Sequence, residues 1–373
     1  MSTQPAQDWK IFKGDLKPHN DIKNLPEPPG WRSFGRTQDV SHIRFAEVIQ
    51  DEIEKNQLRG ATFRLPQDDD GEKLLNLVNA ALYLRRPLLI TGKPGTGKTS
   101  IAYAIAHELN LGPVLVWPIT GRSTLREGLY QYDAIARLQD AQALQIKKEA
   151  ASKINNSDER VTAEKAAEIY NISIGNYFTL GPLGTAFLPY KQPRVLLIDE
   201  VDKSDINLPN DLLNLFEEGE YKIPELARLA KPNFAESRNP QPWDKFIEVQ
   251  THDGSSAWVK EGRVRCYEFP IIILTSNGER DFPPAFLRRC LRITMPDPSA
   301  DTLTAIVKAH LKDAPPGKIK ELVGKFIDKK NDREGSMLAP DQLLNVVYLL
   351  TRQFSPNEAD EKTLTEQLLQ YLE

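Results

Sequence analysis

The sequence predicts an α/β protein, an αβα sandwich around a mostly parallel central sheet, followed by a small all-α domain. Two observations support this prediction. Short runs that are apolar throughout alternate with helical patterns, as in a parallel sheet with helices on both faces. These runs are Leu88–Ile90, Val114–Trp117, Val195–Ile198 and Ile271–Leu274. After Pro296 only helical spacing remains, in the segments Leu303–Leu311, Ile319–Ile327, Gln342–Arg352 and Leu364–Leu372.

Residues 1–60 are expected to form an N-terminal extension that wraps another part of the molecule. Pro26, Pro28, Pro29 and Gly30 prevent regular structure there. Ser41 is a candidate N-cap for a helix from His42 to about Gln57, which would have a loose apolar stripe. We therefore expect no independent domain before residue 61.

The limits of the next predicted elements are set by helix stop signals and by a glycine-rich segment. A helical pattern begins at Glu72 and ends at Pro87. The first strand then runs into the glycine-rich segment Gly92–Gly97, and a helix is expected from Lys98 to about Leu111. Together with the second strand, this forms the beginning of a βαβ arrangement.

Two elaborations interrupt the α/β pattern. A helical insertion occupies about residues 131–190, with helices over Tyr132–Lys153 and Ala163–Tyr170 and a break at Asn155–Asp158. Two βαβ units need only about 60 residues, so the surplus is either a functional elaboration or a tolerated insertion. The second elaboration is Phe246–Phe269. Here two segments in which apolar and polar residues alternate flank Asp253-Gly254, a sequence typical of a hairpin turn.

The composition excludes several classes of protein. The 48 Lys and Arg residues nearly balance the 52 Asp and Glu residues, which argues against a broadly basic nucleic-acid surface. No apolar run approaches the ~18 residues of a membrane span, and no secretory signal is expected at the start. Cys266 and Cys290 are too few for a disulfide framework or a multi-cysteine zinc site and are expected to be buried apolar side chains. A cytoplasmic multidomain protein is therefore expected.

Residues 92–99 match the pattern G-x-x-x-x-G-K-[ST] of a Walker A loop in full. Its glycines allow backbone N–H groups to surround a β-phosphate, Lys98 supplies a charge for the β- and γ-phosphates, and the Thr99 hydroxyl is a ligand for Mg²⁺. A strand before the loop and a helix after it complete the context of a P-loop NTPase. The expected nucleotide-binding residues are Gly92, Pro94, Gly95, Thr96, Gly97, Lys98, Thr99 and Ser100.

Asp199 and Glu200 form the second half of the expected site. They follow the strand Val195–Ile198, and ligands of open α/β sheets bind at the carboxyl ends of the strands. Asp199 would hold Mg²⁺, and Glu200 would polarise the attacking water, because phosphoryl transfer needs a positioned nucleophile. Two solvated acids at a strand end are the structural alternative.

Polar residues after the strand Ile271–Leu274 complete the candidate site. Asn277 could contact both the γ-phosphate and the water, although Ser276-Asn277-Gly278 is also ordinary turn chemistry. Arg288 and Arg289 could reach the γ-phosphate of a neighbouring subunit as an arginine finger. A solvated helix face is the alternative for the two arginines.

In this order, and followed by a helical domain, these elements resemble the AAA+ ATPases, and more closely the MoxR branch and its AAA_5-type relatives. The resemblance covers about Ala61 to the C-terminus. The residues that support it are Gly92–Ser100, Phe178–Phe187, Val195–Lys203, Leu208–Gly219 and Ile273–Cys290.

The resemblance implies an ATP-driven machine that remodels a protein client as a ring, with a hexamer expected. Residues 61–298 would form the nucleotide-binding domain and residues 299–373 the lid. The insertion and the hairpin would lie at the central pore, Asn277 would take the sensor-1 position, and Arg289 is the favoured finger. ATP, Mg²⁺, a homo-oligomer and a von Willebrand factor A-domain partner are implied by the resemblance alone, and so is the preference for adenine.

One position departs from the family pattern. Asp341 lies where MoxR relatives commonly have the sensor-2 arginine, and its charge would repel nucleotide. Either Arg333 or Arg352 substitutes, or coupling of the lid to the nucleotide is weak and hydrolysis is slow.

Two other functions remain open at this point. A nucleic-acid motor or loader resembling McrB would need a basic pore, for which Lys260, Arg263 and Arg265 give modest support. A slow, nucleotide-gated signalling switch would fit the missing sensor-2 arginine. Neither the client nor the ring size can be deduced from the sequence.

Overall fold

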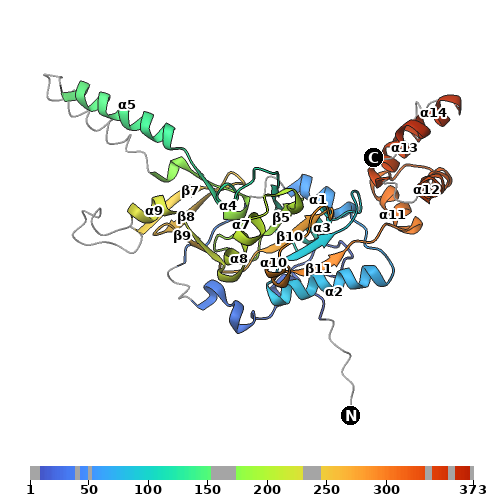
Figure 1. Ribbon diagram of the computed structural model, residues 1–373, viewed down its shortest axis with the longest axis horizontal. Coiled ribbons are helices and arrows are strands. Elements are labelled where there is room, and N and C mark those ends of the chain that lie inside the picture. Colours follow the sequence, from blue (N-terminus) through green and yellow to red (C-terminus); the bar gives the residue numbers. More distant parts are fainter. Residues whose placement is uncertain are drawn as a thin grey trace, which may run out of the picture.

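The computed structural model describes residues 9–37, 43–48, 53–152, 174–229, 245–331, 338–351 and 358–369. A central body contains two β-sheets, with helix α5 (Ala134–Ser152) projecting from one end and a group of helices at the other (Figure 1). Among the described residues, no helix is long and apolar enough to cross a membrane.

Five parallel strands form the central sheet, in the spatial order β11–β1–β10–β5–β2. The predicted parallel α/β sheet is confirmed, and β11 is an additional edge strand. The order brings the carboxyl ends of β1, β10 and β5 together at one edge of the sheet. The strands are β1 (Leu88–Thr91), β2 (Leu115–Pro118), β5 (Val195–Asp199), β10 (Ile271–Ser276) and β11 (Leu291–Thr294).

Alternate side chains of each central strand enter two different cores. In β5, Leu196 and Ile198 pack with helices α7, α8 and α10, whereas Val195 and Leu197 pack with α2 and α3. Because each fully buried Leu, Ile or Val stabilises the fold by about 1.5–3 kcal/mol, both faces favour apolar residues and the strand is apolar throughout. The helices are α2 (Asp69–Leu84), α3 (Ser100–Glu108), α7 (Pro182–Ala186), α8 (Leu208–Glu218) and α10 (Pro284–Arg289).

The second sheet has six strands in the order β3–β4–β7–β8–β9–β6. Its β7–β8 hairpin turns at Asp253 and Gly254, and the turn is tied to the start of β5 by an ion pair of 2.9 Å between Asp253 and the buried Arg194. The strands are β3 (Tyr130–Tyr132), β4 (Phe178–Leu180), β6 (Glu220–Lys222), β7 (Phe246–Gln250), β8 (Ser256–Lys260) and β9 (Arg263–Arg265). Short helical elements flank this sheet: α4 (Leu125–Leu129), η5 (Ile174–Tyr177) and α9 (Pro224–Leu229). The 3₁₀ helix η6 (Val201–Lys203) instead follows β5 and contacts β10 of the central sheet.

Helix α5 corresponds to the first helix expected in the insertion, and it extends away from the body (Figure 1). Ile135, Leu138 and Ile146 on this helix are 60–72% exposed. The expected break at Asn155–Asp158 and the expected second helix, Ala163–Tyr170, lie outside the described residues.

The N-terminal segment packs against α2 and α3. The Asn79 side chain accepts hydrogen bonds from the N–H groups of Ile11 and Phe12, at 2.7 and 2.9 Å. The fully buried carboxylate of Glu108 accepts N–H groups from Lys13, Gly14 and Leu16. The segment contains the 3₁₀ helices η1 (Asp21–Asn24), η2 (Gly30–Arg32) and η3 (Phe34–Thr37).

The predicted helix over His42–Gln57 is wrong in its first part. Residues 43–48 are not helical, and the helix that is present, α1, spans Ile53–Thr62; Ser41 and His42 lie outside the described residues. Tertiary contacts explain the difference: the Ala46 N–H donates to the Pro189 carbonyl at 3.1 Å, and Arg44 stacks 4.3 Å from the Trp258 ring. These contacts outweigh a loose apolar periodicity.

The C-terminal region is helical, as predicted, and has a core of its own. Leu303, Phe326 and Val347 are among its buried side chains. The region lies at the end of the molecule opposite to α5 (Figure 1). Its helices are α11 (Ala300–His310), α12 (Pro316–Asn331), α13 (Pro340–Leu350) and α14 (Glu358–Leu368).

Candidate functional site

A cavity of about 460 Å³ lies at the carboxyl edge of the central sheet, between the sheet and the C-terminal helices. Most of the residues predicted for the site line it: Pro94, Gly95, Thr96, Gly97, Lys98, Thr99, Ser100, Asp199, Glu200 and Asn277. Gly92 lies next to it, at the end of β1. The sheet order brings these segments together, because β5 and β10 are neighbours and β10 pairs with β1.

The loop between β1 and α3 has a conformation that requires glycine. Gly95 and Gly97 have φ angles of +78° and +89°, in the left-handed region. A Cβ atom on Gly95 would also lie 2.6 Å from Cδ of Pro340, at the start of α13. The C-terminal helices therefore contact the loop directly, and a side chain at Gly95 would push them apart.

Lys98 points back into the loop. Its Nζ donates to the carbonyls of Gly92 and Lys93, both at 2.7 Å, and the residue is 7% exposed. Burial lowers the pKa of Lys98, and the negative charges of Asp202, Asp199 and Glu200 oppose that effect. An ammonium has three donors, so one remains for a phosphate oxygen beyond the two bonds made within the described residues.

Asp199 is the centre of a short hydrogen-bond chain across three segments. Its Oδ1 accepts the Thr99 hydroxyl at 3.0 Å and the Thr275 hydroxyl at 2.6 Å. Thr275 Oγ1 in turn accepts the backbone N–H of Glu200 at 2.9 Å. The loop, β5 and β10 are thus joined through one carboxylate oxygen and one buried hydroxyl.

Glu200 lies next to Asn277 and Lys203. The Asn277 side-chain amide is 3.5 Å from Glu200 Oε1, and Lys203 Nζ is 2.7 Å from Glu200 Oε2. Glu200 has a φ of +58°, a left-handed conformation that costs about 1–3 kcal/mol for a residue other than glycine. Its backbone bond to Thr275 helps to hold this conformation.

Comparison with known proteins identifies the family. The family model described as AAA domain (dynein-related subfamily) matches residues 87–290, which is more than half of the chain and includes the loop, Asp199, Glu200 and Asn277. The chain belongs to this AAA family. It is an ATPase. Among solved structures, it is similar to a RuvB variant of Thermotoga maritima, with 14% sequence identity, a TM-score of 0.38, and coverage of 82% of this chain and 70% of that chain.

AAA ATPases bind nucleotide, typically with Mg²⁺, and the oxygen atoms at this site suit such an ion. Thr99 Oγ1 and Asp199 Oδ1 are hard oxygen ligands 3.0 Å apart. Among the described residues, no group of three or more His, Cys, Asp and Glu side chains could hold a metal ion. Mg²⁺ is usually bound through one or two protein oxygens together with phosphates and water.

The two candidate finger arginines lie outside the cavity of their own subunit. Arg288 and Arg289 are on α10; Arg288 is exposed, and Arg289 donates from Nε to Glu217 at 2.7 Å. The side chains of Arg289 and Glu217 are 36% and 43% exposed, so the pair contributes at most about 1 kcal/mol.

Asp341 lines the nucleotide cavity from the first turn of α13. The possible substitutes for a sensor-2 arginine, Arg333 and Arg352, lie outside the described residues. Arg59 and Arg64 do line the cavity, from α1 and the segment that follows it.

Sequence reasoning missed several residues of the site. Thr275 was given no role of its own, and Phe63, which lines the cavity beside Gly97, was not expected at all. Thr275 ends a strand that lies beside the strand ending in Asp199-Glu200. A polar residue in such a place could have been predicted as part of the site. Phe63 has no such signal, since its place depends on how the N-terminal segment crosses the domain.

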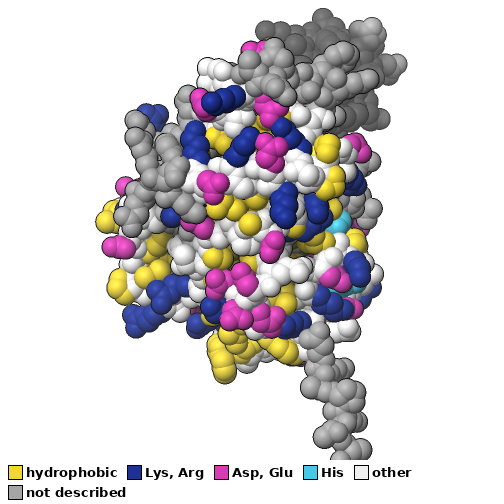
Figure 2. Space-filling model, turned by 90° about the vertical axis from the view of Figure 1, so that its right-hand side faces the viewer, with side chains coloured by type: hydrophobic (Ala, Val, Ile, Leu, Met, Phe, Trp, Pro, Cys, Tyr) yellow, Lys and Arg dark blue, Asp and Glu magenta, His cyan; other side chains and the backbone are white. Residues whose placement is uncertain are grey.

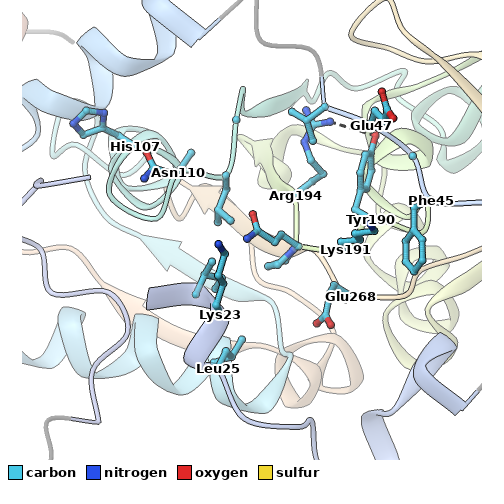
Figure 3. A pocket seen from close by; sticks show the side chains of 18 of the residues that line it. Lys23, Leu25, Phe45, Glu47, His107, Asn110, Tyr190, Lys191, Arg194 and Glu268 are labelled. Carbon is cyan, nitrogen blue, oxygen red and sulfur yellow. Dashed lines mark hydrogen bonds between the residues drawn. The ribbon is translucent and has the colours of Figure 1, made fainter. Parts of the chain in front are cut away.

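A larger cavity, of about 980 Å³, lies near the opposite edge of the sheet, where Arg194 precedes β5 (Figure 3). Two of the charged residues that line it are held in ion pairs: Arg194 with Asp253, and Glu268 with Arg36. These contacts anchor the hairpin and the N-terminal segment, so they are structural. Cys266 and Cys290 are buried and free, as predicted, and burial raises the pKa of Cys290 to about 12.

Proposed function

We propose that this AAA ATPase is a MoxR-like enzyme that remodels a protein client as a ring, with a hexamer as the expected form. AAA ATPases generally form oligomeric rings. The observation that most supports a ring is that Arg288 and Arg289 lie outside the cavity that contains Glu200 and Asn277. A site that needs one of these arginines must receive it from a neighbouring subunit.

We propose the following roles for the residues of the site. Lys98 and the loop N–H groups bind the β- and γ-phosphates, while Thr99 and Asp199 hold Mg²⁺. Glu200 orients the attacking water and accepts its proton. When bound, the metal ion neutralises charge on the phosphate oxygens.

In this proposal the remaining two roles belong to Asn277 and Arg289. Asn277 fixes the water beside Glu200, which is supported by the 3.5 Å separation of the two side chains. Arg289 of the neighbouring subunit stabilises the charge that develops on the γ-phosphate.

The MoxR-like assignment is supported by where the resembling segments lie. Phe178–Phe187, Val195–Lys203, Leu208–Gly219 and Ile273–Cys290 form β4–α7, β5–η6, α8 and β10–α10. We propose residues 61–298 as the nucleotide-binding domain, residues 299–373 as the lid, and α5 with the β7–β8 hairpin as the client-facing elements. A von Willebrand factor A-domain partner is part of this proposal.

Negative-stain imaging of Glu200→Gln with ATP tests the ring. The variant should bind ATP without hydrolysing it and accumulate as closed rings, whereas Lys98→Ala under the same conditions should stay unassembled. A Glu200→Gln protein that binds ATP and remains monomeric would contradict both the trans-acting arginine and the remodelling function.

A slow, nucleotide-gated switch is a second candidate, favoured by Asp341 in the wall of the cavity. A carboxylate there repels the triphosphate and weakens coupling of the lid to hydrolysis. On this basis, Asp341→Arg should raise kcat about tenfold, because it adds a cation near the developing charge. Unchanged turnover would count against a role for Asp341, and a wild-type kcat in the usual range would count against the switch.

A nucleic-acid motor is less well supported. On the second sheet, Arg263 and Arg265 both pair with Glu220, at 3.0 and 3.5 Å, and Lys245 pairs with Glu261 at 2.9 Å. Figure 2 shows basic side chains interspersed with acidic ones over the face at the lid end. Filter binding at two salt concentrations should therefore show none of the steep salt dependence that phosphate contacts produce.

A further inference from the structure

Asp202 is a buried carboxylate that the proposed mechanism does not use. It lies in η6, directly after the Asp199-Glu200 pair, and is 5% exposed. Its Oδ2 accepts the backbone N–H of Asn277 at 2.9 Å and that of Glu279 at 3.2 Å. Its Oδ1 is buried and has no hydrogen-bond partner among the described residues.

The segment that Asp202 binds is not held by the central sheet. The ladders of β10 with its two neighbours end at Ser276 and Leu274, so Asn277 lies beyond both of them. Gly278 then turns the chain with a φ of +79°. The position of Asn277 therefore depends on contacts outside the sheet.

Several of those contacts come from the segment after Glu200, while the Gly278 N–H donates to Ser276 Oγ at 3.0 Å. Besides the two bonds to Asp202, Arg280 Nη2 donates to Ser204 Oγ at 3.3 Å and to the Asp205 carbonyl at 3.4 Å. Asp202 provides the shortest of these bonds, which is the one made to the backbone N–H of Asn277. The backbone that carries Glu200 and the backbone that carries Asn277 are thus joined next to the two side chains.

We propose that Asp202 is a positioning residue for hydrolysis, which sets the distance between Asn277 and Glu200. This inference rests on the roles proposed above for those two residues. A carboxylate suits the task, because one oxygen can accept two N–H groups and its charge strengthens both bonds. An asparagine can present an oxygen at the same point, whereas alanine presents none.

Steady-state kinetics of Asp202→Asn and Asp202→Glu show whether the position of the acceptor oxygen or the charge of the carboxylate matters. Asp202→Asn keeps the acceptor in place and should retain kcat within about threefold, because two neutral bonds replace two charge-assisted ones. Asp202→Glu keeps the charge but moves the oxygen by one methylene, so kcat should fall about tenfold or more with KM unchanged. Asp202→Ala should show the same loss of kcat, and it replaces Asp202→Glu if the larger side chain prevents folding.

A double-mutant cycle with Asn277→Ala tests whether the effect passes through Asn277. The double variant Asp202→Glu/Asn277→Ala should turn over no more slowly than Asn277→Ala alone. Asp211→Ala, which removes an exposed acid from the first turn of α8, is the matched control and should be unchanged.

Three results would overturn the inference: wild-type kcat in both Asp202→Glu and Asp202→Ala, a greater loss in Asp202→Asn than in Asp202→Glu, or effects that multiply in the double variant. Wild-type kcat in Asn277→Ala would instead overturn the role proposed for Asn277, so the two failures are distinguishable.

Discussion

The hydroxyl of Thr275 connects the two carboxylates of the site, and its removal should weaken both stability and turnover. Thr275 is 1% exposed, donates to Asp199 Oδ1 at 2.6 Å and accepts the Glu200 N–H at 2.9 Å. Thr275→Val keeps the shape of the side chain and removes only these two bonds. Thr275→Ser keeps the hydroxyl and serves as the control.

The structure gives the size of the effect. A hydrogen bond to a charged acceptor contributes about 1.5–3 kcal/mol, and leaving a buried N–H without a partner costs about 1–3 kcal/mol. Because Asp199 keeps its bond to Thr99, we expect a combined loss of about 2–4 kcal/mol, or about 3–5 °C in Tm for a chain of this length. The left-handed backbone of Glu200 loses its tether, so we expect kcat to fall about 10- to 100-fold.

Thermal unfolding and phosphate release measure the two effects in the same preparation. Thr275→Val should lose stability and kcat together, and Thr275→Ser should retain most of both. If Thr275→Val matched the wild type in Tm and kcat, the hydrogen-bond chain through Thr275 would have no energetic role and the reasoning would be refuted.

Two further predictions concern Arg289 and the buried Asp253. Arg289→Ala should lower phosphate release about 100-fold or more without loss of nucleotide affinity, and mixing it with the inactive Glu200→Gln protein should restore activity; no recovery would contradict action in trans. Burial alone would raise the pKa of Asp253, but the hydrogen bond from Thr251 and the charge of Arg194 bring it below its usual value of 3.8. Because the folded pKa is the lower one, the stabilisation is complete above about pH 4 and is lost as the pH falls through the folded pKa. The difference in unfolding free energy between wild type and Asp253→Asn should therefore shrink on acidification, and a difference independent of pH would contradict this assignment.

The parts of the fold that depend on local patterns could be predicted from the sequence. Four central strands are apolar throughout because helices cover both faces of the sheet. The loop between β1 and α3 requires glycines because its backbone enters the left-handed region. The edge strand β11 was missed because only alternate residues, such as Leu291 and Ile293, face the core while Arg292 is exposed. The helix expected from His42 failed because its signal was weaker than the contacts that residues 43–48 make with the body.

Contacts within the site depend on strand order and register, which sequence patterns do not determine. Thr275 is 76 positions from the carboxylate it binds, and Asn277 is 75 positions from Asp202. Only the adjacency of β5 and β10 brings these residues together. The residue types at the strand ends predicted that a site exists, and the order of the strands determined which side chains touch.

Nucleotide affinity and turnover of Lys98→Ala test the central claim most directly. If Lys98 and its loop hold a triphosphate beside Asp199 and Glu200, removing the ammonium should weaken ATP binding by about 2–3 kcal/mol, a factor of about 30–160, and abolish phosphate release. The variant should still fold, although it loses the two bonds from Lys98 to the loop carbonyls, and thermal unfolding can verify this. ATP binding and hydrolysis at wild-type levels in Lys98→Ala would contradict the account.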